Sequence, residues 1–239
     1  MTTDKDKDIT RRRENGELRT RSSSLDIAAF LKAARDIEPN RGGRLIFSLD
    51  ATMSRQPSWD RAMTIQASMF DAVDKAGGLA VQLVYFRGID ECRASKWVIN
   101  STALRNLMLS IHCMAGATQI TKVLNHAARE SGTKPVSALV YIGDAIEEPL
   151  DELYRKAGEL GLKGVRCFFF QEGMDNVAEQ GFREMARLTR GAYYRLGPDS
   201  ARELSQLLSA VATYAHGGLK ALSNSKSREA RLLLEQMNR

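Results

Sequence analysis

The sequence predicts an α/β domain with a doubly wound, mostly parallel six-stranded sheet and helices on both faces. Short apolar runs alternate with amphipathic segments from Arg44 to Tyr214, and strands that alternate with helices pair in parallel. Hydrophobic residues make up 43% of the chain and charged residues 27%, which is the balance of a soluble globular protein. The 239 residues suffice for one large domain with tails, but not comfortably for two domains.

Composition divides the chain into three segments. Residues 1–23 lack periodicity and are rich in charge and serine, so we expect a disordered charged tail there. Residues 24–218 form the predicted domain, which begins with a helix capped by Ser24 and ending before Pro39. Residues 219–239 are expected to form a basic C-terminal tail with a short helix.

Six short segments are expected to supply the strands, because each is apolar and bounded by turn residues. The first is GRLIFSLD, which follows Gly42 and ends at Asp50. Residues 96–99 are short, and we expect them in a hairpin at a sheet edge, joined to the preceding strand by a polar connection. The expected strands are 43–50, 79–86, 96–99, 136–142, 165–170 and 192–196.

Longer amphipathic segments separate these strands and predict the helices. In residues 58–76, for example, Trp59, Met63 and Phe70 contribute to one apolar stripe, as a helix packed on a sheet requires. The expected helices are 58–76, 103–112, 119–130, 150–160, 176–189 and 200–214.

Charge and cysteine content exclude several kinds of function. Most of the net charge of +6 lies in residues 1–24 and 220–239, so a folded basic groove for nucleic acid is not expected. The three cysteines, Cys92, Cys113 and Cys167, have neither disulfide nor zinc spacing. No apolar run approaches the length of a membrane span or of a signal sequence. We therefore expect a cytoplasmic protein.

Oxygen-bearing side chains follow two of the predicted strands, at the edge where open parallel sheets bind ligands. Asp50, Thr52 and Ser54 follow the first strand at alternate positions, which an extended loop directs to one side. Asp144 follows strand 136–142, and Thr118 precedes a helix. Two carboxylates and three hydroxyls suit Mg²⁺ or Mn²⁺, with Ca²⁺ as a further option, rather than zinc.

These residues resemble the von Willebrand factor type A family, and specifically its single-domain intracellular bacterial members. The metal-ion-dependent adhesion site (MIDAS) of that family is Asp-x-Ser-x-Ser, then a distant Thr and a distant Asp. Asp50-x-Thr52-x-Ser54 matches the first part with Thr in place of Ser, and Thr118 and Asp144 match the rest. The setting of Thr118, in Gly-Ala-Thr, is similar to the Gly-Gly-Thr of the family. The order of elements agrees from Arg44 to Tyr214.

The resemblance implies a non-enzymatic adaptor. Hydroxyl ligands in the family bind the cation directly, and the carboxylates often hold it through water. A cation held mainly by neutral oxygens accepts an Asp or Glu side chain of a partner protein as its last ligand. Intracellular bacterial members often work beside AAA+ ATPases or in stress and assembly complexes, which are therefore candidate partners.

Three other interpretations compete with a cation site. The same polar residues would also serve as caps of the neighbouring helices. Phosphatases of the haloacid dehalogenase type also carry an aspartate after the first strand, but they need a second one two residues later, where this chain has Thr52. Weak binding of nucleic acid through the basic tails is the third interpretation.

Overall fold

The computed structural model describes residues 43–55, 79–197 and 201–238. The fold below is that of residues 41–239, which form a unit separate from residues 1–40. The expected disordered tail 1–23, the helix beginning at Ser24 and the helix 58–76 lie outside the described residues. Within the described residues, no helix combines the length and apolar character needed to cross a membrane.

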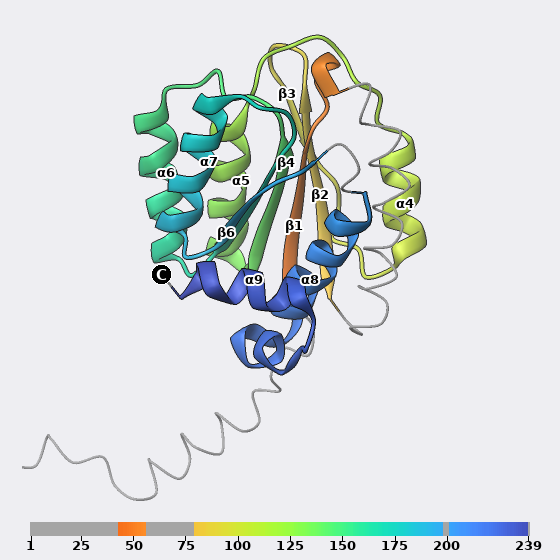
Figure 1. Ribbon diagram of the computed structural model, residues 1–239. Helices are drawn as coiled ribbons and strands as arrows, with labels where there is room; N and C mark the ends of the chain where they lie inside the picture. Colours follow the sequence, from red (N-terminus) through yellow and green to blue (C-terminus); the bar gives the residue numbers. More distant parts are fainter. Residues whose placement is uncertain (1–42, 56–78, 198–200, 239) are drawn as a thin grey trace, which may run out of the picture. The chain divides into compact units, whose positions relative to one another are not determined.

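A six-stranded sheet with the order β3-β2-β1-β4-β5-β6 forms the centre of the domain (Figure 1). All neighbouring strands pair in parallel except β2 and β3, which pair antiparallel. The mostly parallel sheet predicted from the sequence is thus confirmed. Its strands are β1 (Arg44–Asp50), β2 (Ala80–Arg87), β3 (Glu91–Ala94), β4 (Ala138–Gly143), β5 (Arg166–Gln171) and β6 (Ala192–Arg195).

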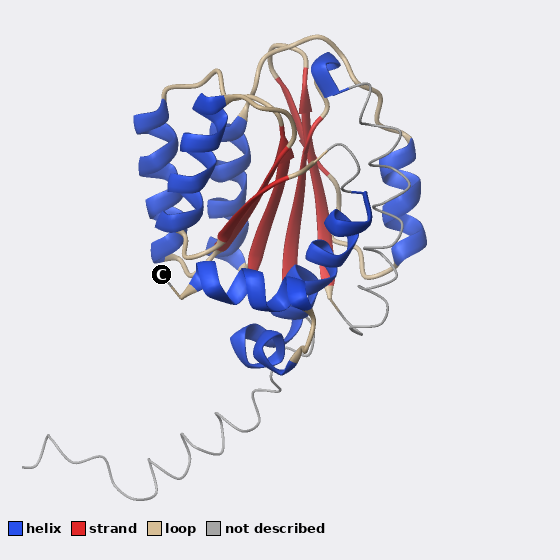
Figure 2. Ribbon diagram, in the orientation of Figure 1, coloured by secondary structure: helices blue, strands red, loops and turns tan. Residues whose placement is uncertain are grey.

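Helices cover both faces of the sheet, as predicted (Figure 2). On one face, Leu45 and Phe47 of β1 pack in a core with residues of α4, α8 and α9. On the other face, Ile46 packs with α5, α6 and α7. The helices are α4 (Ser101–Leu109), α5 (Ile120–Thr133), α6 (Leu150–Leu162), α7 (Asn176–Leu188), α8 (Ala201–Asn224) and α9 (Arg228–Met237).

The edge of the sheet beside β2 differs from the sequence prediction. Strand β3 lies at residues 91–94, within the expected polar connection, and residues 96–99 contribute only a single bridge from Val98 to Val81. The prediction failed because an edge strand is half exposed and keeps charged side chains. Glu91, for example, pairs with both Arg87 and Arg93.

The C-terminal segment is part of the domain rather than a tail. Helix α8 runs ten residues beyond the predicted end at Tyr214, with a break at Gly218, where φ is 68°. Helix α9 follows, and its Leu233 and Met237 are buried in the core. The expected short helix is present, and its apolar side packs in the core on one face of the sheet.

Helices α6 and α7 end in the same hydrogen-bonded turn but with different residues at its left-handed position. In α6, Val165 N donates to Leu160 O, and the left-handed residue is Gly164, with φ 77°. In α7, Gly191 N donates to Ala186 O, and the left-handed residue is Arg190, with φ 52°. Glycine is the usual residue there because a Cβ atom is strained in this conformation. Arg190 is therefore a local cost to the fold.

A partly buried ion pair fastens α5 to the start of the sheet. Glu130 Oε2 lies 2.6 Å from Arg44 Nη2 and accepts a hydrogen bond of 2.8 Å from Trp97 Nε1. The Arg44 guanidinium also lies 3.7 Å from the centre of the Trp97 ring. Burial alone would raise the pKa of Glu130, but the hydrogen bonds from Trp97 and Arg44 outweigh it and lower the pKa.

We predict that Arg190→Gly raises the free energy of unfolding by about 1 kcal/mol, because it removes the left-handed strain. Urea denaturation of the full chain measures the change. The matched control is Gly164→Ala in the equivalent turn, which should lower the free energy of unfolding by about 1 kcal/mol. A less stable Arg190→Gly variant would show that the arginine side chain stabilises the fold by more than its backbone strain costs.

We also predict that Glu130→Gln lowers the free energy of unfolding by about 1–2 kcal/mol at pH 7, since Arg44 loses its counter-charge in a partly buried site. A lowered carboxyl pKa stabilises the fold above the unfolded-state value of 4.5 and ceases to do so as pH falls through the folded-state value. The difference between the two proteins should therefore shrink below pH 4.5 in urea titrations. Glu159→Gln, which breaks an exposed pair with Arg155, should change stability by less than about 0.5 kcal/mol.

Candidate functional site

The five candidate ligands line a single cavity of about 270 Å³ at the carboxyl ends of β1 and β4. Asp50 is the last residue of β1, and Asp144 directly follows β4. Thr118 comes from the segment before α5. No lysine or arginine is among the described residues that line the cavity. Its lining is Asp50, Thr52, Met53, Ser54, Ala115, Gly116, Thr118, Asp144, Ala145 and Glu147.

The loop after β1 turns back on itself through local hydrogen bonds. Asp50 is fully buried, and its Oδ1 accepts a hydrogen bond of 2.9 Å from Thr52 N. The hydroxyls of Thr52 and Ser54 lie 3.0 Å apart, within hydrogen-bond distance of one another. The short 3-10 helix η1 (Met53–Arg55) completes the turn. The alternate residues of the motif are thus close together in space.

A close backbone contact positions the segment that carries Thr118. Gly116 packs against the turn after β2 so tightly that a Cβ atom would lie 2.0 Å from Gly88 O. Ala117 N donates to the same Gly88 carbonyl at 3.1 Å. Only glycine fits at position 116, which explains the first residue of the Gly-Ala-Thr sequence. Thr118 is held at the cavity with a side chain that is almost completely buried.

Glu147 and Thr118 join the two loops by a reciprocal pair of hydrogen bonds. Thr118 N donates to Glu147 Oε2 at 2.8 Å, and Glu147 N donates to Thr118 Oγ1 at 3.0 Å. Glu147 lies three residues beyond Asp144, so this pair brings the loop after β4 against the segment before α5.

Glu148 continues this contact at the amino end of α5. Its Oε2 accepts from Ile120 N at 2.6 Å, and its Oε1 accepts from Thr121 N at 2.7 Å. The N-cap residue Gln119 makes no capping hydrogen bond with its own side chain. A distant carboxylate therefore satisfies the first N–H groups of α5, where a negative charge also suits the helix dipole.

The capping interpretation does not account for Thr118 or Asp144. Glu148, rather than Thr118, caps α5, and the hydroxyl of Thr118 bonds to the Glu147 backbone. Helix α6 has Pro149 at its N-cap and no side-chain cap, so Asp144 does not serve it either. The helix that Asp50 and Ser54 were expected to cap lies outside the described residues.

The donors that line the cavity fit a hard divalent cation. Asp144 Oδ1 is buried and has no hydrogen-bond partner among the described residues. A nearby positive charge stabilises a buried carboxylate oxygen that lacks a hydrogen bond. The other candidate donors are oxygens too, which is the ligand type of Mg²⁺, Mn²⁺ and Ca²⁺. The described residues contain no cluster of three or more His, Cys, Asp or Glu side chains that could bind a metal ion. The candidate site is not such a cluster, because three of its five candidate donors are hydroxyls.

Sequence reasoning missed Glu147 and Glu148. Both occur in the loop that Asp144 begins, in GDAIEEP. Two acidic residues before a helix are ordinarily assigned to that helix, because carboxylates stabilise the first turn. Glu147 bonds to Thr118, just before α5, and Glu148 bonds to the first residues of α5. These partners are 27 to 29 residues apart, so the bonds form only when the loop after β4 returns to the amino end of α5.

No family model matches the chain, and no curated protein matches it. Solved structures do match. An aerotolerance-related membrane protein from Bacteroides fragilis NCTC 9343 is 17% identical with a TM-score of 0.58, covering 72% of this chain and 98% of the other. A von Willebrand factor type A protein from Catenulispora acidiphila is 16% identical with a TM-score of 0.61, covering 74% of this chain and 43% of the other.

A third similar structure is proximal thread matrix protein 1 from the mussel byssus, with zinc in its MIDAS motif. It is 15% identical, with a TM-score of 0.57, and the match covers 73% of this chain and 46% of the mussel chain. This chain therefore spans less than half the length of the Catenulispora and mussel proteins. At these identities the likeness concerns the fold.

We predict that Glu148→Ala lowers the free energy of unfolding by about 1 kcal/mol, because the amino end of α5 loses its cap. Hydrogen exchange at the Ile120 and Thr121 amides should accelerate more than exchange in the central turns of α5. The control is Glu152→Ala on α6, which should leave exchange at both amides unchanged. Unchanged exchange in Glu148→Ala would mean that another group holds this end of the helix.

Proposed function

Because the chain has the fold of von Willebrand factor type A domains, we propose that it is a non-enzymatic adaptor that binds another protein through a divalent cation. The proposed ligands are Asp50, Thr52, Ser54, Thr118 and Asp144. The proposed cation is Mg²⁺ or Mn²⁺, with Ca²⁺ as a further option. The proposed partner contributes an Asp or Glu side chain.

Asp144 carries this proposal, because it lines the cavity with four other oxygen-bearing candidate ligands and its buried Oδ1 has no hydrogen-bond partner among the described residues. Neutral hydroxyls make up most of the donor set, so a bound cation would retain much of its charge. When bound, it supplies an open coordination position for a carboxylate of the partner. The residues of this chain hold the cation, and the bonds from Glu147 and Glu148 join the loop that Asp144 begins to Thr118 and the amino end of α5.

The rim of the cavity suits a protein rather than a free anion. Met53, between the candidate ligands Thr52 and Ser54 in sequence, lines the cavity and is 51% exposed. Met114 directly precedes the lining residue Ala115 in sequence; its N–H donates to Ala51 O at 3.0 Å, and it is 43% exposed. Exposed methionines adapt to varied apolar surfaces. A partner that presents an acidic side chain flanked by apolar residues would contact both the cation and this rim.

The alternatives have less support. A phosphatase of the haloacid dehalogenase type needs a carboxylate two residues after Asp50, where the Thr52 hydroxyl instead lies beside Ser54. Of the two basic tails that motivated nucleic-acid binding, residues 1–24 lie outside the described residues, and residues 220–238 include the end of α8 and the helix α9, whose apolar side packs in the core. Among protein partners, we propose an AAA+ ATPase or a stress or assembly complex, on the basis of the family resemblance. We also propose a cytoplasmic location.

We predict that Mg²⁺ or Mn²⁺ binds the full chain weakly, since an open site of this kind leaves several waters on the cation. Titration calorimetry should detect one site in the natural sequence and none in Asp144→Ala. The control is Asp151→Ala, which removes the same charge at an exposed position outside the cavity. Equal binding by Asp144→Ala and the natural protein would refute the assigned ligands.

The partner is tested separately by affinity capture with the full chain as bait. Capture in Mg²⁺ or Mn²⁺ should be lost with EDTA and with Asp144→Ala, and kept with Asp151→Ala. Circular dichroism checks that each variant is folded. A partner retained equally in EDTA would contradict capture through a cation.

A further inference from the structure

A second cavity, of about 810 Å³, lies between α7, β6 and α9. Four arginines line it, whereas Glu235 is its only acidic lining residue in the described part of the chain. We call it the arginine groove and define it by Arg166, Arg183, Arg187, Arg190 and Gln236. Arg166 begins β5, and Gly191, also in the lining, directly precedes β6. The groove therefore lies at the edge of the sheet where the parallel strands β5 and β6 begin. The cation cavity lies at the opposite edge, where the parallel strands end.

Three of the arginines form a stripe. Arg183 and Arg187 are one helical turn apart on α7, and Arg190 follows three residues later in the turn that ends the helix. A helical turn rises about 5.4 Å. Side chains on one side of an extended peptide repeat about every 6.6 Å. An extended segment with acidic residues at alternate positions therefore approximately matches the spacing of the stripe.

The stripe already binds carboxylates, but only loosely. Arg183 Nη2 lies 2.8 Å from Glu179 Oε1, and Arg187 Nη2 lies 2.6 Å from Glu184 Oε1. Both arginine side chains are more than half exposed, at 58% and 66%. Ion pairs this exposed contribute little to stability, so a partner's carboxylates can replace Glu179 and Glu184 at low cost.

Arg190 adds an independent observation. It occupies a left-handed position that favours glycine, and its side chain is exposed. Its side chain makes no ion pair among the described residues, while its backbone carbonyl accepts a hydrogen bond of 2.9 Å from Arg166. The backbone conformation at position 190 therefore disfavours an arginine, and no ion pair among the described residues compensates for it. Strained residues that lack a structural role are concentrated at binding sites.

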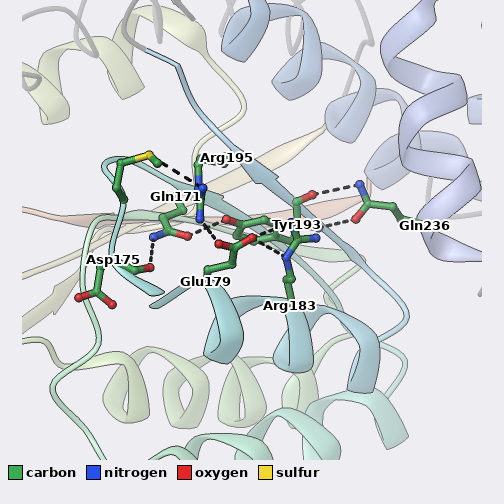
Figure 3. Close-up of polar contacts among 8 residues, drawn as sticks. Gln171, Asp175, Glu179, Arg183, Tyr193, Arg195 and Gln236 are labelled. Carbon is green, nitrogen blue, oxygen red and sulfur yellow. Dashed lines mark hydrogen bonds and ion pairs between the residues drawn. The ribbon is translucent and has the colours of Figure 1, made fainter. Parts of the chain in front are cut away.

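The floor of the groove favours contact through side chains of a protein. Gln236 Oε1 accepts from Tyr193 N at 2.9 Å, and Gln236 Nε2 donates to Tyr193 O at 3.0 Å (Figure 3). These bonds occupy the outer edge of β6 at Tyr193, where an added strand would otherwise pair. The Arg183 guanidinium lies 4.3 Å from the centre of the Tyr193 ring. That ring is therefore covered and cannot stack on a nucleic-acid base.

We propose that the arginine groove binds an extended acidic segment of a partner protein, with carboxylates at alternate positions. Guanidinium groups bind carboxylates through two parallel hydrogen bonds, which select both the negative charge and the orientation of each carboxylate. This surface needs no cation. It lies away from the cation cavity and shares no lining residue with it, so both surfaces can be occupied at the same time.

The probe for this proposal is a fluorescein-labelled peptide in which Glu alternates with Ala, titrated with the full chain and followed by fluorescence anisotropy. We expect Arg187→Glu to weaken binding about tenfold or more, because an attractive charge becomes a repulsive one. Arg190→Gly should weaken binding several-fold while the protein stays folded by circular dichroism. The matched control is Arg155→Glu, on α6 outside the groove, which breaks a similar exposed pair with Glu159 and should change binding less than twofold.

Two further arms identify the ligand chemistry and separate the surfaces. EDTA and Asp144→Ala should leave peptide binding unchanged, so loss of the cation site would not affect this result. Equal binding of a peptide with Gln in place of Glu would overturn the proposal, and so would an equal loss in Arg155→Glu. Tighter binding of a single-stranded oligonucleotide of the same charge would also overturn it, because the groove would then be a nucleic-acid surface.

Discussion

The candidate site depends on the contact between the loop after β4 and the amino end of α5. Thr118 and Asp144 are far apart in sequence, and each belongs to a loop with few regular backbone bonds of its own. The reciprocal bonds between Glu147 and Thr118, and the two bonds from Glu148 to α5, tie these loops together. The carboxylates satisfy N–H groups that would otherwise be unpaired at the helix terminus. The helix is stabilised and the cavity is shaped by the same contact.

The sheet determines where polar chemistry can occur. Residues of β1 are buried on both faces, because helices cover the sheet from each side. Polar groups are therefore found mainly where strands end. Asp50 ends β1 and Asp144 directly follows the neighbouring parallel strand β4 at one edge, and Arg166 begins β5 at the other. The domain consequently has two polar regions at opposite ends of an apolar centre.

The two proposed surfaces would recognise carboxylates by different physical means. At the cation cavity, a partner oxygen would become a ligand of a metal ion, an interaction with strict directional requirements. In the arginine groove, guanidinium groups would bind several carboxylates through exposed pairs that salt weakens. A domain with both surfaces could join one partner through a single acidic residue to another through an acidic segment, which is a suitable arrangement for an adaptor.

The sequence by itself determined the α/β class, the order of strands and helices and the residues of the candidate ligand set, because apolar periodicity and polar residues after strands are local signals. Strand β3 was missed because an exposed edge keeps charged residues, and α9 was expected in a tail because its charge hides its buried Leu233 and Met237. The tertiary structure alone decided that Glu147 bonds to Thr118, that Glu148 caps α5 and that Arg190 faces a groove with α9. Those contacts join segments distant in sequence, so the loop after β4 must return to the amino end of α5, and α9 must pack on β6, before they exist.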